Sequence, residues 1–145
     1  MSEKSVSSVL MAQIFEYPIK VTEEHIDQFK HVNNEVYVSW IMQASNAHSE
    51  SFGYNLQKYV EDGAAFVVRR HEIDYLAPVV LGEDIIVETW VPEMSVVKTI
   101  REFRITRTRD KKVVLQAKTT FAYVSLTTGR PITIPQKLHD VFATI

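Results

Sequence analysis

An acidic residue, a histidine and two asparagines lie within eight residues of this chain, at Asp27, His31, Asn33 and Asn34. A carboxylate can attack a carbonyl carbon, or it can activate a water molecule for that attack. A helix that begins at Asn34 would offer unpaired backbone N–H groups and a partial positive charge, which stabilise an oxyanion. His31 could orient the carboxylate or hydrogen-bond the substrate. These residue types, in this order, favour acyl hydrolysis.

Each of these residues also has an ordinary structural use. An aspartate in a polar loop commonly stabilises a turn through its own backbone. His31 can be a structural hydrogen-bond partner, and Asn33 is a suitable cap for a helix that follows it. Residue types and spacing alone leave the catalytic and the structural interpretations open.

Cysteine chemistry is excluded, because the chain contains no cysteine. Its five histidines show no ligand spacing such as a helical His-x-x-x-His, so we predict no metal site. We also expect no cofactor. The formal net charge of −2 gives no general attraction to nucleic acid or to an anionic membrane, and we expect neither as a partner.

The chain is expected to form one domain over residues 1–145, in which residues 1–10 are a loose, Ser-rich leader. No apolar run is long enough for a signal peptide, and none approaches the ~18 apolar residues of a membrane span. We therefore expect a cytoplasmic protein without a membrane partner.

The elements that must position the polar segment follow from the spacing of apolar residues. A strand is predicted at 13–21, one helical turn at 22–29 capped by Thr22, and a long helix at 34–52 capped by Asn33. From residue 64 the apolar period changes to two, which predicts four more strands and a last helical turn or two: 64–76, 84–92, 97–108, 113–126 and 135–142.

This order predicts an α+β domain, in which a five-stranded antiparallel sheet wraps around one long central helix. Trp40 and Tyr37 are predicted to be core or interface aromatics on that helix. A single helix covers only one face of a sheet, so some apolar surface needs a partner. We therefore expect a homodimer or a tetramer made of two dimers.

Two motifs resemble those of a known family. The pattern Asp27-x-x-x-His31-Val32-Asn33-Asn34-x-x-Tyr37 resembles the signature of the 4-hydroxybenzoyl-CoA thioesterase-like branch of the hotdog superfamily. Residues 71–83 resemble its second landmark, a strand that runs into Tyr-x-x-Pro and a Gly-Asp/Glu turn. Residues 129–135 resemble its C-terminal segment. The three segments occur in the family's order.

The resemblance implies a hotdog fold and an acyl-CoA thioesterase that releases a free acid and CoA. It implies that Asp27 is the nucleophile or general base, that the backbone N–H of Asn34 holds the oxyanion, and that His31 is the family's histidine. Asn33 and Tyr37 are expected beside the substrate. Among the basic residues of 98–112, the resemblance implies that Lys98 and Arg101 meet the CoA phosphates at the mouth of the site.

Alternative assistants for catalysis are Glu72, His48 and Glu50, although polar-face positions are the simpler interpretation of all three. The chain also departs from the family pattern at Phe29, where acyl-ACP thioesterases carry Asn, and at Lys30, where glycine is usual. Lysine enters a positive-φ conformation less readily than glycine, so the loop geometry could differ. These departures favour an alternative interpretation, in which the protein binds acyl-CoA or an acyl carrier without catalysing a reaction. A hotdog dehydratase is less favoured, because the acid and the histidine here precede the long helix.

Overall fold

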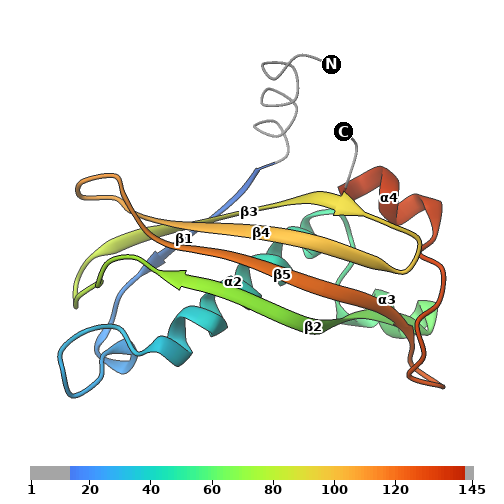
Figure 1. Cartoon of the computed structure of the whole chain (residues 1–145), viewed down its shortest axis with the longest axis horizontal. Helices are drawn as coiled ribbons and strands as arrows, with labels where there is room; N and C mark the ends of the chain where they lie inside the picture. The colour runs from blue at the N-terminus through green and yellow to red at the C-terminus, as the bar shows by residue number, and fades with distance from the viewer. Residues whose placement is uncertain (1–13, 143–145) are drawn as a thin grey trace, which may run out of the picture.

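One antiparallel sheet of five strands forms the front layer of the computed structural model, which describes residues 14–142 (Figure 1). The strand order across the sheet is β1-β3-β4-β5-β2. The strands are β1 (Phe15–Lys20), β2 (Ala64–Tyr75), β3 (Asp84–Met94), β4 (Lys98–Arg107) and β5 (Lys112–Ser125). All five predicted strands are therefore confirmed. The predicted leader at 1–10 lies outside the described residues.

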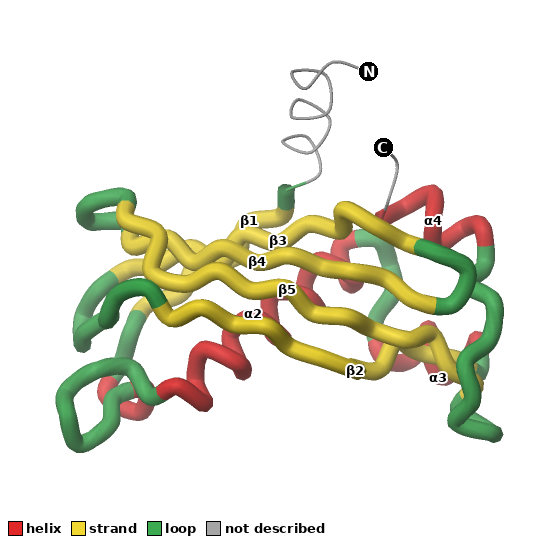
Figure 2. Tube along the Cα trace, viewed as in Figure 1, coloured by secondary structure: helices red, strands yellow, loops and turns green. Residues whose placement is uncertain are grey.

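The long predicted helix, α2 (Asn34–Ser51), crosses behind this sheet (Figure 1). The short elements are η1 (Glu23–His25), α3 (Leu56–Asp62) and α4 (Gln136–Phe142). Figure 2 places the loop between η1 and α2 at one end of the molecule, and α3 and α4 at the other end. Within residues 14–142, no helix is long and apolar enough to cross a membrane.

The main core lies between α2 and the inner face of the sheet. Trp40 and Ile41 of α2 are buried against strand residues such as Phe103 and Ile105. Full burial of each such side chain stabilises the fold by about 1.5–3 kcal/mol. The period of two along β4 places every second residue on this inner face, so the sheet and helix predicted from the pattern pack as expected.

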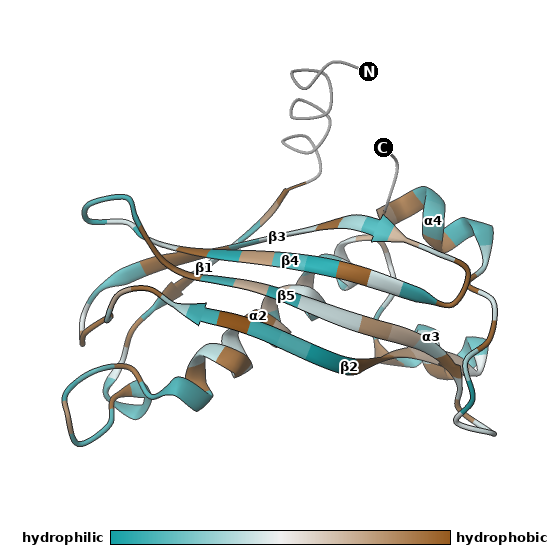
Figure 3. Cartoon of the chain, viewed as in Figure 1, coloured by the Kyte–Doolittle hydropathy of each residue, from teal (hydrophilic) through white to brown (hydrophobic). Residues whose placement is uncertain are grey.

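The outer face of the sheet is more polar at its centre. Hydrophilic and hydrophobic residues alternate along β4 (Figure 3). There the Arg104 guanidinium donates two hydrogen bonds of 3.0 Å to the Glu88 carboxylate. This face does not need a second helical layer within the chain.

The helix α3 was not predicted. Asn55 caps it by accepting a hydrogen bond from the Lys58 backbone N–H at 2.9 Å, and Gly63 ends it in the left-handed conformation, with φ of 72°. Leu56 and Val60 are 79% and 58% exposed, so α3 lacks the buried apolar stripe by which a helix is recognised in a sequence.

Candidate active site

The loop between η1 and α2 closes on itself. The backbone N–H of Asp27 donates to the carbonyl of His31 at 2.9 Å, and Ile26 and Val32 form a bridge beside this pair. The backbone N–H of Asn33 donates to the carbonyl of His25 at 3.0 Å, so the two ends of the loop meet. The segment that carries Asp27 and His31 is thus a closed projection at the start of α2.

Asp27 stabilises this loop through one carboxylate oxygen. Its Oδ1 accepts hydrogen bonds from the backbone N–H groups of Phe29 at 2.8 Å and His31 at 3.4 Å. Among the described residues, Oδ2 has no hydrogen-bond donor. The structural use of an aspartate in a turn is therefore present, and it leaves the second oxygen available for other chemistry.

Lys30 takes the backbone conformation that glycine would supply most easily. Its φ is 66°, and its N–H donates to the carbonyl of Asp27 at 3.0 Å to complete the turn. The expectation that lysine would change the loop by avoiding positive φ is wrong. Phe29, the other departure from the family pattern, is 72% exposed at the tip of the loop.

At the start of α2, the cap residue accepts a hydrogen bond from one backbone N–H, and a second backbone N–H is left without an acceptor among the described residues. Asn33 has extended backbone angles, and its side chain accepts a hydrogen bond from the Glu35 N–H at 3.0 Å, which confirms it as the helix cap. Among the described residues, the backbone N–H of Asn34 donates no hydrogen bond. This N–H lies at the positive end of the helix and is suited to an anion or an oxyanion.

The second motif packs directly against the loop. The Val32 N–H donates to the carbonyl of Val79 at 3.0 Å, and His31 and Val80 form a backbone bridge. Val21, just before η1, exchanges backbone hydrogen bonds with the turn that ends the motif. The two motifs, far apart in the sequence, therefore form one unit in space.

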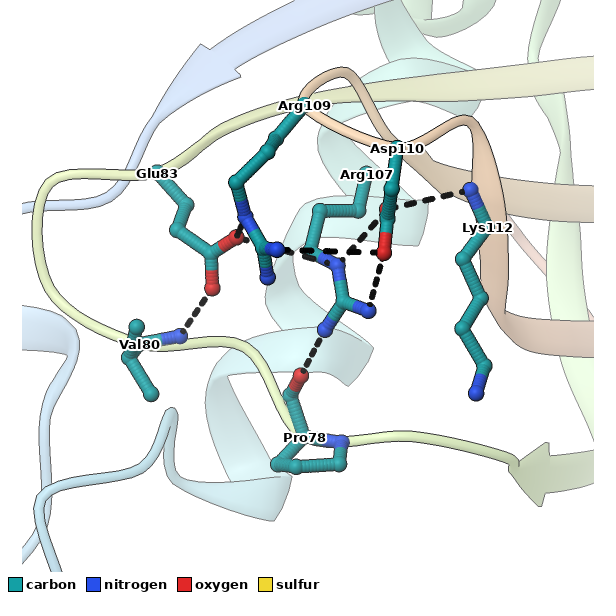
Figure 4. A network of polar contacts seen from close by, with 7 residues as sticks. All are labelled: Pro78, Val80, Glu83, Arg107, Arg109, Asp110 and Lys112. Atoms are coloured by element: carbon teal, nitrogen blue, oxygen red, sulfur yellow. Dashed lines mark hydrogen bonds and ion pairs between the residues drawn. The ribbon is translucent and has the colours of Figure 1, made fainter.

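A network of charges fixes this second segment (Figure 4). Arg107 donates to the carbonyl of Pro78 at 2.9 Å and to both carboxylate oxygens of Asp110, at 2.9 and 2.7 Å. The Arg107 guanidinium holds the pKa of Asp110 well below its usual range. Glu83 accepts from the Val80 N–H at 3.0 Å and pairs with Arg109 at 3.2 Å. The network therefore fixes the segment around Val79 and Val80, against which the Asp27 loop packs.

This positioning role of Arg107 was not predicted. By residue type alone, it is one of several basic residues in 98–112, the region where the resemblance implies contacts to the CoA phosphates. The period of two along β4 could have revealed it, because Arg107 shares the buried face of Phe103 and Ile105.

Tyr37 lies in the core next to this unit. It is 4% exposed and packs edge-on against Trp40 and Tyr75, at 5.5 and 5.7 Å between ring centres. Burial raises its pKa to about 12, so the hydroxyl stays protonated at neutral pH. The prediction of a core aromatic is confirmed.

Comparison with known proteins decides the family. The model of the thioesterase-like superfamily matches residues 21–142, which include both motifs and nearly the whole fold. This chain belongs to the thioesterase-like superfamily. It has the hotdog fold and is a thioester hydrolase, as the resemblance implied.

Relatives of this thioesterase act on different carriers. The chain is 28% identical to the long-chain acyl-CoA thioesterase FadM of Escherichia coli, over 84% of this chain and 92% of that protein. It is also 28% identical to a chloroplastic acyl-acyl carrier protein thioesterase of Arabidopsis thaliana, over 88% of this chain and 67% of the relative. A 1,4-dihydroxy-2-naphthoyl-CoA thioesterase from Synechocystis has the same fold, with a TM-score of 0.83, 18% identity and coverage of 91% and 97%.

Two basic residues of β4 predicted at the mouth of the thioesterase site lie in different environments. Lys98 is exposed at the start of the strand. Arg101 is only 5% exposed, and its Nη1 donates to His48 Nδ1 at 2.9 Å and to Thr89 Oγ1 at 3.1 Å. Arg101 faces the helix, not open solvent, and its contact with the CoA phosphates stays a prediction.

The three residues considered as alternative catalytic assistants also lie in different environments. Glu72 is exposed and pairs with Arg70 at 2.7 Å, and Glu50 is exposed on α2, as the polar-face interpretation predicted. His48 is 4% exposed, so the same interpretation is wrong for it. Among the described residues, none of the three forms a hydrogen bond or an ion pair with the loop that carries Asp27.

His48 should make this thioesterase sensitive to acid. Burial, and then the nearby Arg101, lower the pKa of His48 from 6.5 to about 3. The unfolded chain therefore binds a proton that the folded protein does not, so stability present above pH 6.5 is lost as the pH falls toward 3. Between pH 8 and pH 5 we expect His48 to lower the free energy of unfolding by up to about 2 kcal/mol. Urea unfolding at both pH values measures the loss.

His48→Gln is the matched variant, since glutamine can accept the hydrogen bond from Arg101 but does not titrate. It should lose less stability than the wild type between these two pH values. Equal losses in the two proteins would show that other groups cause the acid sensitivity.

Proposed function

We propose that this thioesterase hydrolyses an acyl-CoA and that Asp27 is the central catalytic group. The observation that carries the proposal is the closed loop that leads into α2: it holds Asp27 by one oxygen, and the Asn34 N–H at the helix start donates no hydrogen bond among the described residues. A carboxylate that attacks the carbonyl or activates water, together with an oxyanion donor, can hydrolyse a thioester.

In the proposed mechanism the thioester carbonyl oxygen accepts a hydrogen bond from the Asn34 N–H at the positive end of α2. Asp27 then attacks the carbonyl carbon through Oδ2, or removes a proton from a water molecule that attacks. A C–O bond forms, the C–S bond breaks, and the CoA thiolate leaves. In the water route, the proton that Asp27 removed passes to the thiolate and the free acid forms directly. In the nucleophilic route, water then hydrolyses the anhydride between Asp27 and the acyl group, which releases the acid, supplies the proton for the thiolate and restores the carboxylate. His31, which is exposed and tied to Asp27 through the backbone, is placed to hydrogen-bond the substrate or the attacking water.

CoA is proposed as the carrier because the relative FadM, named a long-chain acyl-CoA thioesterase, is matched over most of its length. Lys98 is proposed as a contact for the CoA phosphates, since its ammonium group is exposed. Asn33 and Tyr37 support the substrate site indirectly, through the helix cap and the packing beneath the loop.

Thiol release from a panel of short, long and aromatic acyl-CoAs tests this function, with the same acyl groups on acyl carrier protein in parallel. Turnover of acyl-CoA at rates above those on the carrier protein is the expected result. Turnover on the carrier protein alone would overturn CoA as the carrier. Tight binding of acyl-CoA without any thiol release would overturn the proposed activity.

We also propose that the protein is a homodimer or a tetramer of two dimers. The strand β2 lies at the edge of the sheet, and Val68 on it is 39% exposed. An unpaired edge strand of this length is normally covered or paired. Light scattering on the purified protein should give twice or four times the mass of one chain, whereas the mass of a monomer would contradict the proposal.

A further inference from the structure

A cavity of about 340 Å³ lies between the second half of α2, α3 and the inner face of the sheet. The helix α3, which lines the cavity, lies at the end of the molecule opposite the loop between η1 and α2 (Figure 2). The helix contributes a stripe at a spacing of three and four residues, which runs along Met42, Ser45 and Ser49. The facing walls are mostly apolar and include Phe66, Val68, Val91 and Phe121. The volume is near the lower limit for a small-molecule site.

A buried cation, Arg101, lines this cavity. The lining also includes polar side chains and one carboxylate, Glu50, which is exposed on α2 and forms no ion pair with Arg101. Both recorded hydrogen bonds of the Arg101 guanidinium come from Nη1 and go to His48 and Thr89. Within residues 14–142, neither Nε nor Nη2 has an acceptor, and no carboxylate lies within ion-pairing distance. The Phe142 ring, 5.6 Å from the guanidinium carbon, is the remaining favourable contact.

The neighbours of Arg101 do not balance its charge. Its bond to His48 Nδ1 requires that nitrogen to be unprotonated, because a guanidinium only donates hydrogen bonds. His48 is therefore neutral. The Thr89 hydroxyl is neutral too and donates in turn to the carbonyl of Glu102 at 2.9 Å.

The other arginines of β4 provide an internal comparison. Arg104 forms two hydrogen bonds to the Glu88 carboxylate, and Arg107 forms two to the Asp110 carboxylate. Arg101 is the most buried of the three, and it alone has no carboxylate partner among the described residues. A buried charge is expensive unless it is paired. An unpaired guanidinium beside an open cavity therefore indicates an anionic ligand.

We propose that this cavity binds an apolar chain that ends in a carboxylate, and that Arg101 pairs with that carboxylate. The apolar walls take the chain, and the free N–H groups of Arg101 match a carboxylate. Such a ligand has two sources: a free fatty acid, or the far end of a dicarboxylic acyl group on the substrate. Binding itself does not depend on the proposed function, whereas the second source rests on it.

The distance along α2 limits which dicarboxylic acyl groups could place their far carboxylate at Arg101. Asn34 and His48 are separated by 14 residues of helix, which is ~21 Å at 1.5 Å per residue. Within one subunit, an acyl chain with its thioester at the start of α2 reaches Arg101 only if it is long and extended.

Calorimetric titration of the full chain tests the binding. Dodecanoate and dodecanedioate are the carboxylate probes, and dodecanol is the matched neutral chain. We expect the carboxylates to bind roughly 10- to 100-fold more tightly than dodecanol, the range for charge-assisted hydrogen bonds. Equal affinity of dodecanoate and dodecanol for the wild type would overturn the proposal, and this comparison needs no variant.

Arg101→Met should abolish the preference for carboxylates, while Arg104→Met, on the outer face of the same strand, should retain it. Arg101→Met should also unfold at the same temperature as the ligand-free wild type or above it, because it removes an unpaired buried charge. A lower unfolding temperature with an unchanged preference for carboxylates would show that Arg101 is a structural residue, and would overturn its assigned role.

Rates of hydrolysis then show whether the carboxylate belongs to a free fatty acid or to the far end of the acyl group of the substrate. A higher kcat/KM for dodecanedioyl-CoA than for dodecanoyl-CoA, reversed in Arg101→Met, would identify the carboxylate as part of the substrate. Binding of dodecanoate that depends on Arg101, without such a preference, would identify a free fatty acid as the ligand. Binding of carboxylates with no hydrolysis of any acyl-CoA would overturn the proposed function and leave this site intact.

Discussion

Asp27→Asn is expected to lower kcat for thioester hydrolysis by ~10²–10⁴-fold while the protein remains folded. The amide cannot attack the carbonyl or accept a proton from water. It can still accept the hydrogen bonds from the Phe29 and His31 N–H groups, so the turn should keep its shape. Thiol release under saturating acyl-CoA measures kcat, and thermal unfolding of the same samples shows whether the fold is retained.

Glu35→Gln is the matched control, since it removes a carboxylate from the first turn of α2 without touching the loop. It should change kcat only a few-fold. If Asp27→Asn kept more than about a tenth of the wild-type rate, the drop would be below the range of a general base, and Asp27 would have only its structural role.

The regular elements were predictable because their signals are local. The period of two in the four later strands, and Asn33 before the apolar stripe of α2, each depend on a few neighbouring residues. The helix α3 lacks such a signal, since Leu56 and Val60 face outward. A sequence pattern reports burial, and an element that buries little leaves no pattern.

The candidate site was predictable only in part. The order of Asp27, His31 and Asn34 indicates the chemistry, yet the loop depends on contacts from the distant segment around Val79. The Arg107 network that holds this segment is a tertiary arrangement, which spacing does not reveal. Charge alone is also misleading for Arg101, because a basic residue in a strand suggests an exposed position, although the alternation along β4 places this one inside.

The two uses of Asp27 are compatible in this geometry. Its Oδ1 organises the loop that precedes α2, and Oδ2 accepts no hydrogen bond among the described residues. The turn, including the positive φ of Lys30, thus keeps the carboxylate in one orientation before substrate arrives. Such preorganisation lowers the reorganisation required at the moment of reaction.

Asn34→Pro is expected to lower kcat by ~10²–10³-fold, because proline has no backbone N–H to hold the oxyanion. The position otherwise suits proline. Asn34 is the first residue of α2, where proline is favoured, and its N–H makes no hydrogen bond among the described residues. The preceding Asn33 has φ of −63° and ψ of 137°, the extended conformation that proline imposes on the residue before it. Thiol release and urea unfolding of the same variant therefore separate catalysis from stability.

Asn34→Ala is the control, since it removes the side chain and keeps the N–H. It should retain kcat within a few-fold, whereas Asn34→Pro should lose activity with a change in the free energy of unfolding of no more than about 0.5 kcal/mol. A loss in both variants would point to the Asn34 side chain, and full activity in both would place the oxyanion donor elsewhere. Only a loss confined to proline identifies the backbone N–H, because the proline and alanine variants share every other consequence of removing the asparagine.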